Sequence, residues 1–367
     1  MTQPANAPAT PIRVVVADDS GFMRRMLSDA LGQHGFEVVG VAANGDEALG
    51  VCTRLHPDVL TLDLAMPGLD GIGVLRALRD SASPIPVVVV SAFSPAHGAR
   101  AVDALAEGAV DLVAKPAAGN PPSNFFAELG SKVRAAAGSR RSSLAAPRAA
   151  ATATHARAAS PRPAPAATTP SVVRPRTRSR TRRTVVIACS TGGPRALAGL
   201  IPMLPSPLGE GVVIVQHMPP GFTGSLAARL DLASGLEVRE ASGGELLDPR
   251  VALLAPGGKH LRMSDSGHVR LSDEAEVGGL RPRADITIKD VAGRFGPRTL
   301  LVVLTGMGRD GLEGAQDVRR LGGRVLVEAE STCTVYGMPR AISEAGLADA
   351  ELPLHDLAAA IVEEAGT

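Results

Sequence analysis

Five residues in the N-terminal third of the chain have side chains suited to binding a metal ion and a phosphoryl group. Asp18 and Asp19 directly follow one apolar run, and Asp63 ends another. Ser91 and Lys115 end two further runs. If these runs are parallel strands, their carboxyl ends share one sheet edge, where ligand sites usually form. Three carboxylates there would repel one another without a cation, and their oxygens suit Mg²⁺.

Together, these side chains indicate a phosphorylation switch. A carboxylate can accept a phosphoryl group, while an ammonium and a hydroxyl stabilise the added charge. Taken singly, each residue is ordinary, because acids at strand ends and Lys-Pro pairs are common. The occurrence of all five at successive strand ends favours the switch.

A second set of residues, Ser190, His217 and Asp310, could carry out acyl transfer. Ser190 follows the apolar run TVVIAC, and the next residues, TGGP, lead into a helical pattern. Glycines permit a tight turn, and proline fits the first turn of a helix. The hydroxyl would therefore stand at a helix N-terminus, where free N–H groups favour developing negative charge.

The turn alone does not identify a nucleophile, because strand–glycine–helix junctions also cradle phosphates and nucleotides. It lacks both the GxGxxG and the GxxxxGK patterns of such cradles. His217 ends the run GVVIVQ, and Asp310 follows TLLVVL. A hydroxyl becomes a good nucleophile when an imidazole takes its proton and a carboxylate orients that imidazole. Geometry rather than chain order defines such a triad, so the unfamiliar order and the missing GxSxG are no objection.

The elements that must position the first set form an α/β pattern over residues 12–137. Apolar strand candidates alternate with helical patterns, which is typical of a doubly wound parallel sheet. The strand candidates are residues 12–17, 38–41, 59–62, 87–90 and 110–113, and helical patterns include 22–31 and 71–78.

The same pattern positions the second set, over residues 184–366. A hairpin is expected over residues 260–272, around Ser266-Gly267. His260 and His268 fall in this hairpin, which makes them poorer candidates for a general base than His217. The pattern predicts a mainly parallel, hydrolase-type α/β domain with a small antiparallel addition. Its strand candidates are 184–188, 211–216, 251–254, 299–304 and 324–327, and its helices lie near 194–204, 222–232 and 311–321.

Residues 138–183 interrupt this rhythm and predict a disordered linker rich in Arg, Pro and Ala. Between Ser139 and Arg183 there are eleven Arg and no Asp or Glu, while the whole chain carries +1, so the remainder carries about −10. That acidic balance disfavours DNA binding by the folded domains. The Arg-rich segment is either a solvated spacer or an electrostatic tether to acidic receptors or an anionic membrane surface.

The composition is that of a cytoplasmic protein that does not span a membrane. No apolar run reaches the roughly 18 residues that a membrane helix needs, and the first residues lack a secretory signal. Cys52, Cys189 and Cys333 lie far apart with no CxxC pair, which favours reduced thiols over metal binding. With no Trp and one Tyr, the cores must be built from Val, Leu, Ile and Ala, which suits buried parallel sheets.

The first set of motifs resembles the receiver domain of two-component response regulators. The resemblance rests on DD at 18–19, TLDLAMPGLDG at 61–71, Ser91 and KP at 115–116. It implies a flavodoxin-like, five-stranded parallel sheet and phosphorylation at Asp63.

This resemblance also implies further roles within the first domain. Mg²⁺ would be held chiefly by Asp19 and Asp63, with Asp18 assisting and the carbonyl of Ala65 as a further ligand. Switching would proceed through Ser91 and Lys115. One departure is Leu112, which stands where many receivers carry an aromatic switch residue.

The second set of motifs resembles the chemotaxis protein-glutamate methylesterase/glutaminase family over about residues 184–350. By this resemblance Ser190 is the nucleophile, His217 the general base and Asp310 the orienting acid. The backbone N–H groups of Thr191 and Met307 would form the oxyanion hole, and the hydrolase would need no cofactor. The motifs, in chain order, are ACSTGGPRAL, VQHMPPGFT, APGGKHL, RPRADI, LTGMGRDGLEGA and STCTVYGMP.

The two resemblances together imply a phosphorylation-regulated serine hydrolase. It would demethylate glutamate methyl esters and deamidate specific glutamines on methyl-accepting chemotaxis receptors. A chemotaxis histidine kinase would donate the phosphoryl group, the unphosphorylated receiver would cover the active site, and no specific nucleic acid would bind. The alternatives are a response regulator with a non-catalytic or DNA-binding output, or a nucleotide-binding module that uses the STGGP turn.

Overall fold

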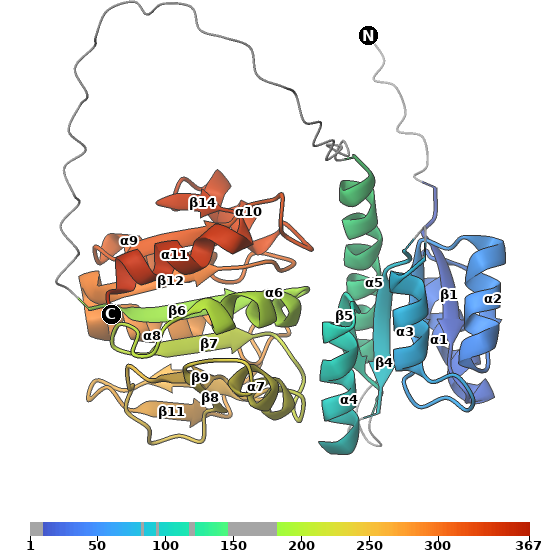
Figure 1. Ribbon diagram of the computed structural model, residues 1–367, viewed down its shortest axis with the longest axis horizontal. Coiled ribbons are helices and arrows are strands. Elements are labelled where there is room, and N and C mark those ends of the chain that lie inside the picture. The colour runs from blue at the N-terminus through green and yellow to red at the C-terminus, as the bar shows by residue number, and fades with distance from the viewer. Residues whose placement is uncertain (1–9, 82–83, 93–94, 117–121, 146–181) are drawn as a thin grey trace, which may run out of the picture.

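The protein consists of two α/β domains that pack side by side (Figure 1). The first contains strands β1 to β5 and the second contains β6 to β14. Most of the predicted linker lies outside the described residues. So does most of its Arg-rich segment, for which a role as an electrostatic tether was considered. The computed structural model describes residues 10–81, 84–92, 95–116, 122–145 and 182–367.

The first domain is built on a five-stranded sheet of order β2-β1-β3-β4-β5. Every neighbouring pair is parallel, which confirms the predicted flavodoxin-like sheet. The Val- and Leu-rich strands β3 and β4 are buried throughout, as expected for a sheet covered by helices on both faces. The strands are β1 (Arg13–Ala17), β2 (Glu37–Ala42), β3 (Val59–Leu62), β4 (Val87–Ser91) and β5 (Asp111–Ala114).

Five helices complete the described part of the first domain, and most of them begin at a side chain that caps the helix. Ser20, Asn44 and Asp70 each accept a hydrogen bond from a backbone N–H of the first turn. The last helix, α5, continues beyond residue 137, where the sequence pattern placed the start of the linker. The helices are α1 (Gly21–Gln33), α2 (Gly45–Leu55), α3 (Gly71–Arg79), α4 (Pro95–Ala106) and α5 (Pro122–Ala145).

The second domain is built on a seven-stranded sheet of order β14-β13-β12-β6-β7-β9-β8, and all its neighbouring strands are parallel. The predicted antiparallel hairpin is confirmed as β10 and β11, with Gly267 at φ 85° in its turn. The strands are β6 (Thr184–Cys189), β7 (Val212–Gln216), β8 (Glu237–Glu240), β9 (Val251–Leu254), β10 (His260–Met263), β11 (Val269–Ser272), β12 (Thr299–Val303), β13 (Arg324–Glu328) and β14 (Ala350–Leu352).

Several elements of the second domain were not predicted from the sequence. The edge strand β8 is polar (EVRE) and β14 has three residues, so neither shows a buried-strand pattern. Helix α8 begins inside the RPRADI motif, and α10 and α11 were also missed. The helices are α6 (Gly193–Leu200), α7 (Thr223–Asp231), α8 (Ala284–Phe295), α9 (Leu312–Arg320), α10 (Met338–Glu344) and α11 (Leu354–Ala365), with 3-10 turns η1 (Ile201–Met203) and η2 (Gly296–Arg298).

Strand β6 occupies the centre of the second sheet, between β12 and β7. The chain leaves β6 for β7 on one side and later returns to β12 on the other side. Such a reversal opens a crevice at the carboxyl ends of the central strands, where ligands bind in open α/β sheets.

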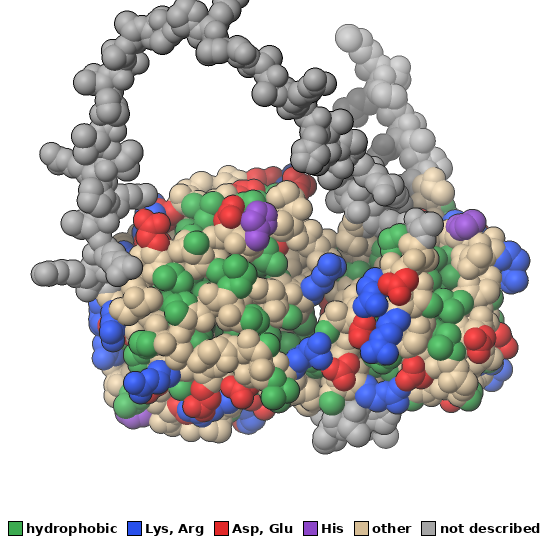
Figure 2. Space-filling model, viewed as in Figure 1, with side chains coloured by type: hydrophobic (Ala, Val, Ile, Leu, Met, Phe, Trp, Pro, Cys, Tyr) green, Lys and Arg blue, Asp and Glu red, His purple; other side chains and the backbone are tan. Residues whose placement is uncertain are grey.

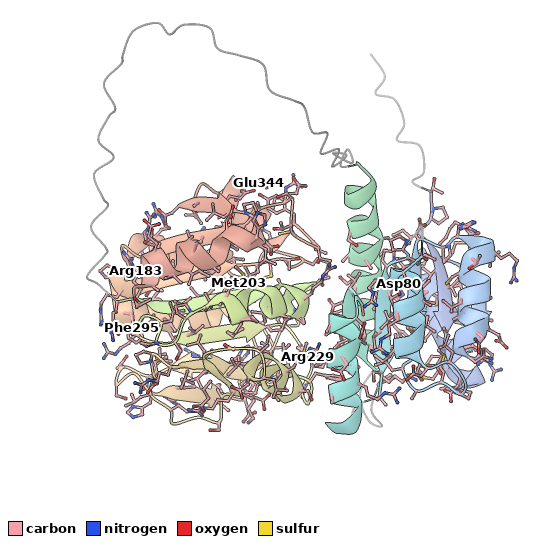
Figure 3. All side chains as sticks on the ribbon, viewed as in Figure 1. Asp80, Arg183, Met203, Arg229, Phe295 and Glu344 are labelled. Atoms are coloured by element: carbon pink, nitrogen blue, oxygen red, sulfur yellow. The ribbon has the colours of Figure 1, made fainter. Side chains whose placement is uncertain are left out.

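Helix α4 of the first domain packs against helices α6 and α7 of the second, and α5 contacts the second domain through Ser131 and Met307 (Figure 1). One cluster of buried apolar residues continues from the first core into the second, so the contact is hydrophobic at its centre. At its margin Arg229 Nη1 lies 2.5 Å from Asp103 Oδ1, and Figure 3 places Arg229 on the side facing the first domain. Figure 2 shows acidic and basic side chains intermingled on the first domain near this junction.

In the described part of the chain, no helix combines the length and the apolar character needed to cross a membrane.

Candidate active site and phosphorylation site

The turn after β6 holds Ser190 at the carboxyl end of the second sheet. The N–H of Ser190 donates to the carbonyl of Thr305 at 3.0 Å, which ties it to the end of β12. Gly192 adopts φ 81°, a conformation that disfavours other residues. A methyl group on Gly193 would lie 2.0 Å from Gln216 Oε1, so glycine is required for the close approach of the turn to β7.

His217 lies beside Ser190 because the two residues end neighbouring strands in register. Cys189 pairs with Gln216, and the N–H of His217 donates to the carbonyl of Cys189 at 3.1 Å, so the residues that follow the two strands lie side by side. The side chain of Gln216 braces both backbones, since its amide donates to the carbonyls of Ser190 and His217 at 3.0 and 2.9 Å. The structure therefore brings the predicted nucleophile and base together.

Asp310 reaches His217 from the other side of β6. His217 Nε2 lies 2.7 Å from Asp310 Oδ2, and both side chains are almost fully buried. This contact leaves Nδ1 as the ring nitrogen free to take a proton. Among the described residues, the Ser190 hydroxyl makes no hydrogen bond to the ring.

Backbone N–H groups surround the Asp310 carboxylate and keep it charged. Its oxygens accept hydrogen bonds from the N–H groups of Ala284, Asp285 and Gly311 at 2.7 to 3.0 Å. Burial would raise the pKa of Asp310, but the hydrogen bond and charge of His217 outweigh it, and the pKa lies well below its ordinary value. A carboxylate held in this way can orient the imidazole without taking its proton.

Two residues that sequence reasoning missed support Asp310 from helix α8. Arg283 Nε lies 3.5 Å from Asp310 Oδ1, and its Nη2 lies 2.7 Å from Asp285 Oδ2. Asp285 Oδ1 in turn accepts the N–H groups of Gly311 and Gly314 at 2.8 and 2.9 Å. Burial and the nearby charge of Asp310 raise the pKa of Asp285. The only sequence signal for these two residues was the RPRADI motif, which gave no role to either.

The two predicted oxyanion-hole residues flank Ser190. Within the described chain, neither the N–H of Thr191 nor that of Met307 has an intramolecular acceptor. Their side chains contact the first domain. The Thr191 hydroxyl donates to Asp111 Oδ2 at 2.6 Å, and Ser131 Oγ lies 3.6 Å from Met307 Sδ.

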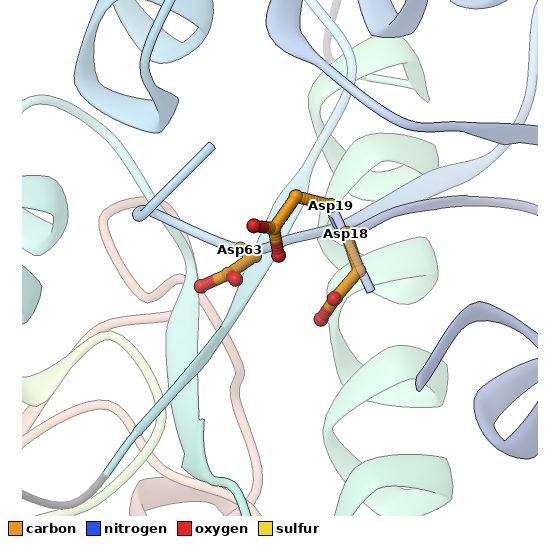
Figure 4. Close-up of side chains that lie close together, drawn as sticks. All are labelled: Asp18, Asp19 and Asp63. Atoms are coloured by element: carbon orange, nitrogen blue, oxygen red, sulfur yellow. The ribbon is translucent and has the colours of Figure 1, made fainter. Parts of the chain in front are cut away.

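The first domain gathers the predicted carboxylates at the carboxyl end of its own sheet (Figure 4). One oxygen from each of Asp18, Asp19 and Asp63 lies within 4.8 Å of the others, a spacing that fits a shared divalent cation. Lys115 Nζ lies 2.8 Å from Asp18 Oδ2 and 2.7 Å from Asp63 Oδ2. This arrangement is an acidic cluster typical of a Mg²⁺ site.

Lys115 and Ser91 are the two other residues predicted to take part in the switch. Burial would lower the pKa of Lys115, but its contacts with Asp18 and Asp63 outweigh it and raise the pKa above its ordinary value. Ser91 is fully buried, and its hydroxyl has no hydrogen-bond partner among the described residues. Leu112, the departure from the usual aromatic residue, is buried in the apolar cluster that spans both domains.

The remaining histidine candidates lie outside the triad. His260 is buried, where its ring bonds the carbonyl of Ala275 and the N–H of Arg283. His268 lies in the hairpin and contacts Ser266. Neither ring contacts Ser190 or Asp310.

Comparisons with known proteins match one family to each of the two domains. Residues 14–121 match the family described as response regulator receiver domain, and residues 185–361 match the family described as CheB methylesterase. A protein-glutamate methylesterase/protein-glutamine glutaminase of Symbiobacterium thermophilum is 43% identical over 360 residues, which cover 97% of this chain and 98% of that protein.

A second relative agrees, and one solved structure is also similar in sequence. Protein-glutamate methylesterase/protein-glutamine glutaminase 5 of Myxococcus xanthus is 43% identical over 356 residues, 95% of this chain and 97% of that protein. The crystal structure of the Thermotoga maritima CheB methylesterase catalytic domain shares 43% identity. It covers 50% of this chain and 98% of that chain, with a TM-score of 0.48.

Proposed function

The chain belongs to the CheB methylesterase family of protein-glutamate methylesterase/glutaminases, and on that premise we propose that Ser190, His217 and Asp310 are its catalytic residues. As a member of this family it acts in chemotaxis adaptation and carries a regulatory receiver domain. The observation that best supports the triad is the 2.7 Å contact between His217 Nε2 and Asp310 Oδ2, beside a serine at the end of the next strand.

The proposed reaction is acyl transfer through Ser190. His217 takes the hydroxyl proton as Ser190 Oγ bonds to the carbonyl carbon of a methylated glutamate. The tetrahedral oxyanion is stabilised by the N–H groups of Thr191 and Met307. When it collapses, the C–O bond to the methoxy group breaks and His217 gives its proton to the departing methanol. Water then attacks the acyl-serine by the same route in reverse, releasing glutamate, and with glutamine the leaving group is ammonia.

A Ser190→Ala variant tests this proposal. Methanol release from methylated receptor should fall by roughly 10⁴-fold or more, and labelling by a fluorophosphonate serine probe should disappear. Ser264→Ala, in the hairpin, is the matched control and should retain both. Labelling that persists in Ser190→Ala would reject the assignment.

For the receiver domain we propose phosphorylation at Asp63, with a chemotaxis histidine kinase as the donor. Asp19 and Asp63 would hold Mg²⁺, with Asp18 assisting, and the 4.8 Å spacing of their oxygens fits such an ion. When bound, Mg²⁺ supplies positive charge against the phosphoryl oxygens. Lys115 lies where its ammonium can stabilise the same charge, and Ser91 can offer its hydroxyl.

We further propose that the receiver inhibits the esterase by covering the oxyanion hole. The supporting observation is that Asp111 and Ser131 contact Thr191 and Met307, the two residues assigned to stabilise the oxyanion. A substrate glutamate could not reach these N–H groups while the contacts hold. A phosphodonor should therefore raise methanol release by the full chain, and an Asp63→Asn chain should not respond.

The family implies methyl-accepting chemotaxis receptors as substrates and a kinase as phosphodonor. We propose that the reaction takes place in the cytoplasm, which fits the free thiols of Cys52, Cys189 and Cys333. We also propose domain limits of 12–137 and 184–366.

A further inference from the structure

Thr305, the second residue after β12, is a junction of four segments of the second domain. Its N–H donates to Glu328 Oε2 at 2.8 Å, and its carbonyl accepts the N–H of Ser190 at 3.0 Å. Its hydroxyl donates to the carbonyl of Thr191 at 2.9 Å and accepts the N–H of Val335 at 2.9 Å. Thr305 is 1% exposed, and its hydroxyl is engaged by these backbone groups.

These bonds fix the nucleophile turn relative to the loop that carries Met307. Thr191 is held through its carbonyl by the Thr305 hydroxyl, and Met307 lies two residues beyond Thr305 on the same loop. Between them, a methyl group on Gly306 would lie 2.9 Å from Ser190 Cβ, so the loop packs directly against the nucleophile. The separation of the N–H groups of Thr191 and Met307 is therefore set through Thr305.

We propose that Thr305 is a positioning residue of the esterase reaction, and that its hydroxyl holds the two oxyanion donors at the spacing the tetrahedral intermediate requires. The inference rests on the function proposed above for Ser190, Thr191 and Met307. It assigns a role to a side chain that touches neither substrate nor triad.

Glu328, at the end of β13, anchors Thr305. Its side chain is fully buried and Oε2 accepts the Thr305 N–H. Its other oxygen, Oε1, has no hydrogen-bond partner among the described residues. Burial raises the pKa of Glu328 above its ordinary value. The anchor of Thr305 is therefore a single buried acceptor oxygen.

A positioning role predicts that kcat changes while KM does not. Oxyanion donors act on charge that develops in the transition state, so a displaced donor leaves substrate binding intact. Loss of one such donor costs about 10²–10³-fold in kcat, and a displaced donor should cost less, about 10- to 100-fold.

The experiment compares Thr305→Val with Thr305→Ser in the full chain. Methanol release from methylated receptor is measured with a phosphodonor present, and each variant is melted to follow folding. Thr305→Val, which is nearly isosteric but lacks the hydroxyl, should lose about 10- to 100-fold in kcat with KM unchanged. Thr305→Ser, which keeps the hydroxyl and loses only the methyl group, should stay within about threefold of wild type. Wild-type kcat in Thr305→Val, or an equal loss in Thr305→Ser, overturns the proposal.

Four further variants make every outcome decisive. If Thr305→Val does not fold, Thr305→Ala replaces it, and failure of both to fold assigns the hydroxyl to stability and rejects the positioning role. Glu328→Gln keeps an acceptor oxygen and should retain kcat, whereas Glu328→Leu should behave like Thr305→Val. Ser190→Ala is run in parallel: activity in that variant rejects the proposed triad, while an inactive Ser190→Ala beside a fully active Thr305→Val rejects only the role of Thr305.

Discussion

The two domains place reactive carboxylates at the same position of similar parallel sheets, yet they compensate the charge differently. In the second domain, Asp310 accepts hydrogen bonds from three backbone N–H groups and from His217. In the first domain, Asp18 and Asp63 share the ammonium of Lys115, and Asp19 is exposed.

The difference shows that the hydrogen-bond donors and cations around a carboxylate decide which chemistry it is suited to. Fixed backbone N–H groups satisfy Asp310 in place, which suits it to its proposed role of orienting the neighbouring ring. The acidic cluster of the receiver has more negative charge than Lys115 can neutralise. It is therefore suited to binding a cation and to accepting a phosphoryl group on Asp63.

The largest expected effect comes from making the same substitution in both domains. Asp310→Asn should lower kcat by about 10⁴-fold, because the amide no longer stabilises the required tautomer of His217. Asp63→Asn should leave basal methanol release unchanged and abolish its increase with a phosphodonor. Assaying both full-length variants with and without phosphodonor tests the contrast. It breaks down if Asp63→Asn loses basal activity or if Asp310→Asn keeps it.

A smaller loss is expected from Arg283→Gln, which weakens the support around Asp310 without touching Ser190 or His217. The guanidinium lies near both Asp310 and Asp285, so its removal should let the carboxylates shift and lower kcat by about 10²-fold. Lys259→Gln removes a surface ion pair of the same domain and is the matched control. Equal activity in the two variants would show that Asp310 is held without the Arg283 guanidinium.

The strand-end residues of both sites could be predicted because parallel strands bring their carboxyl ends together. Ser190, His217 and Asp310 each follow a strongly apolar run, so the sheet edge that collects them was visible in the sequence. The same reasoning collected the acids of the first domain. Strand patterns failed only where burial was weak, as in the polar edge strand β8.

The supports of the site could not be predicted in this way. Arg283 and Asp285 enter it from the start of α8, and the bond from the Asp285 N–H to Asp310 spans 25 residues with no periodic signal. The contact between Asp111 and Thr191 spans 80 residues and depends on how two folded domains dock. A hydrogen-bond acceptor contributed by a loop or by another domain leaves no pattern in its own segment.

The docking contact provides a third prediction, of a smaller effect on activity. Asp111→Asn keeps the shape of the side chain but weakens its hydrogen bond to Thr191, and bonds to charged groups contribute about 1.5–3 kcal/mol. Basal methanol release without phosphodonor should rise by roughly 3- to 30-fold as the receiver covers the site less. Asp103→Asn removes only the exposed pair with Arg229 and should change activity less than twofold, since surface pairs contribute about 0–1 kcal/mol. An Asp111→Asn chain with wild-type basal activity would show that the hydrogen bond between Asp111 and Thr191 does not keep the domains closed.

The smallest expected effect concerns the stability of the folded state. It tests whether Asp285, unlike its neighbour Asp310, destabilises the second domain when it is ionised. Burial and the charge of Asp310 raise the pKa of Asp285 to about 6, so ionising Asp285 destabilises the folded state. The free energy of unfolding should therefore fall as the pH rises from about 4, the pKa of Asp in the unfolded chain, to about 6, the pKa of Asp285 in the folded state. Above that pH the loss of stability should stay constant. Asp285→Asn keeps an oxygen to accept the N–H groups of Gly311 and Gly314 and removes the charge.

The variant should consequently be about 1 kcal/mol more stable than wild type at pH 7.5 and equal to it at pH 4. Urea denaturation of the full chain at several pH values measures the difference, with Asp265→Asn in the exposed hairpin turn as the control. A variant less stable than wild type at pH 7.5 would mean that the ion pair of Asp285 with Arg283 outweighs its repulsion from Asp310. In that case the second domain would stabilise Asp285, like Asp310, in its charged form. Both carboxylates of the pair would then differ from the receiver cluster, whose negative charge exceeds what Lys115 can neutralise.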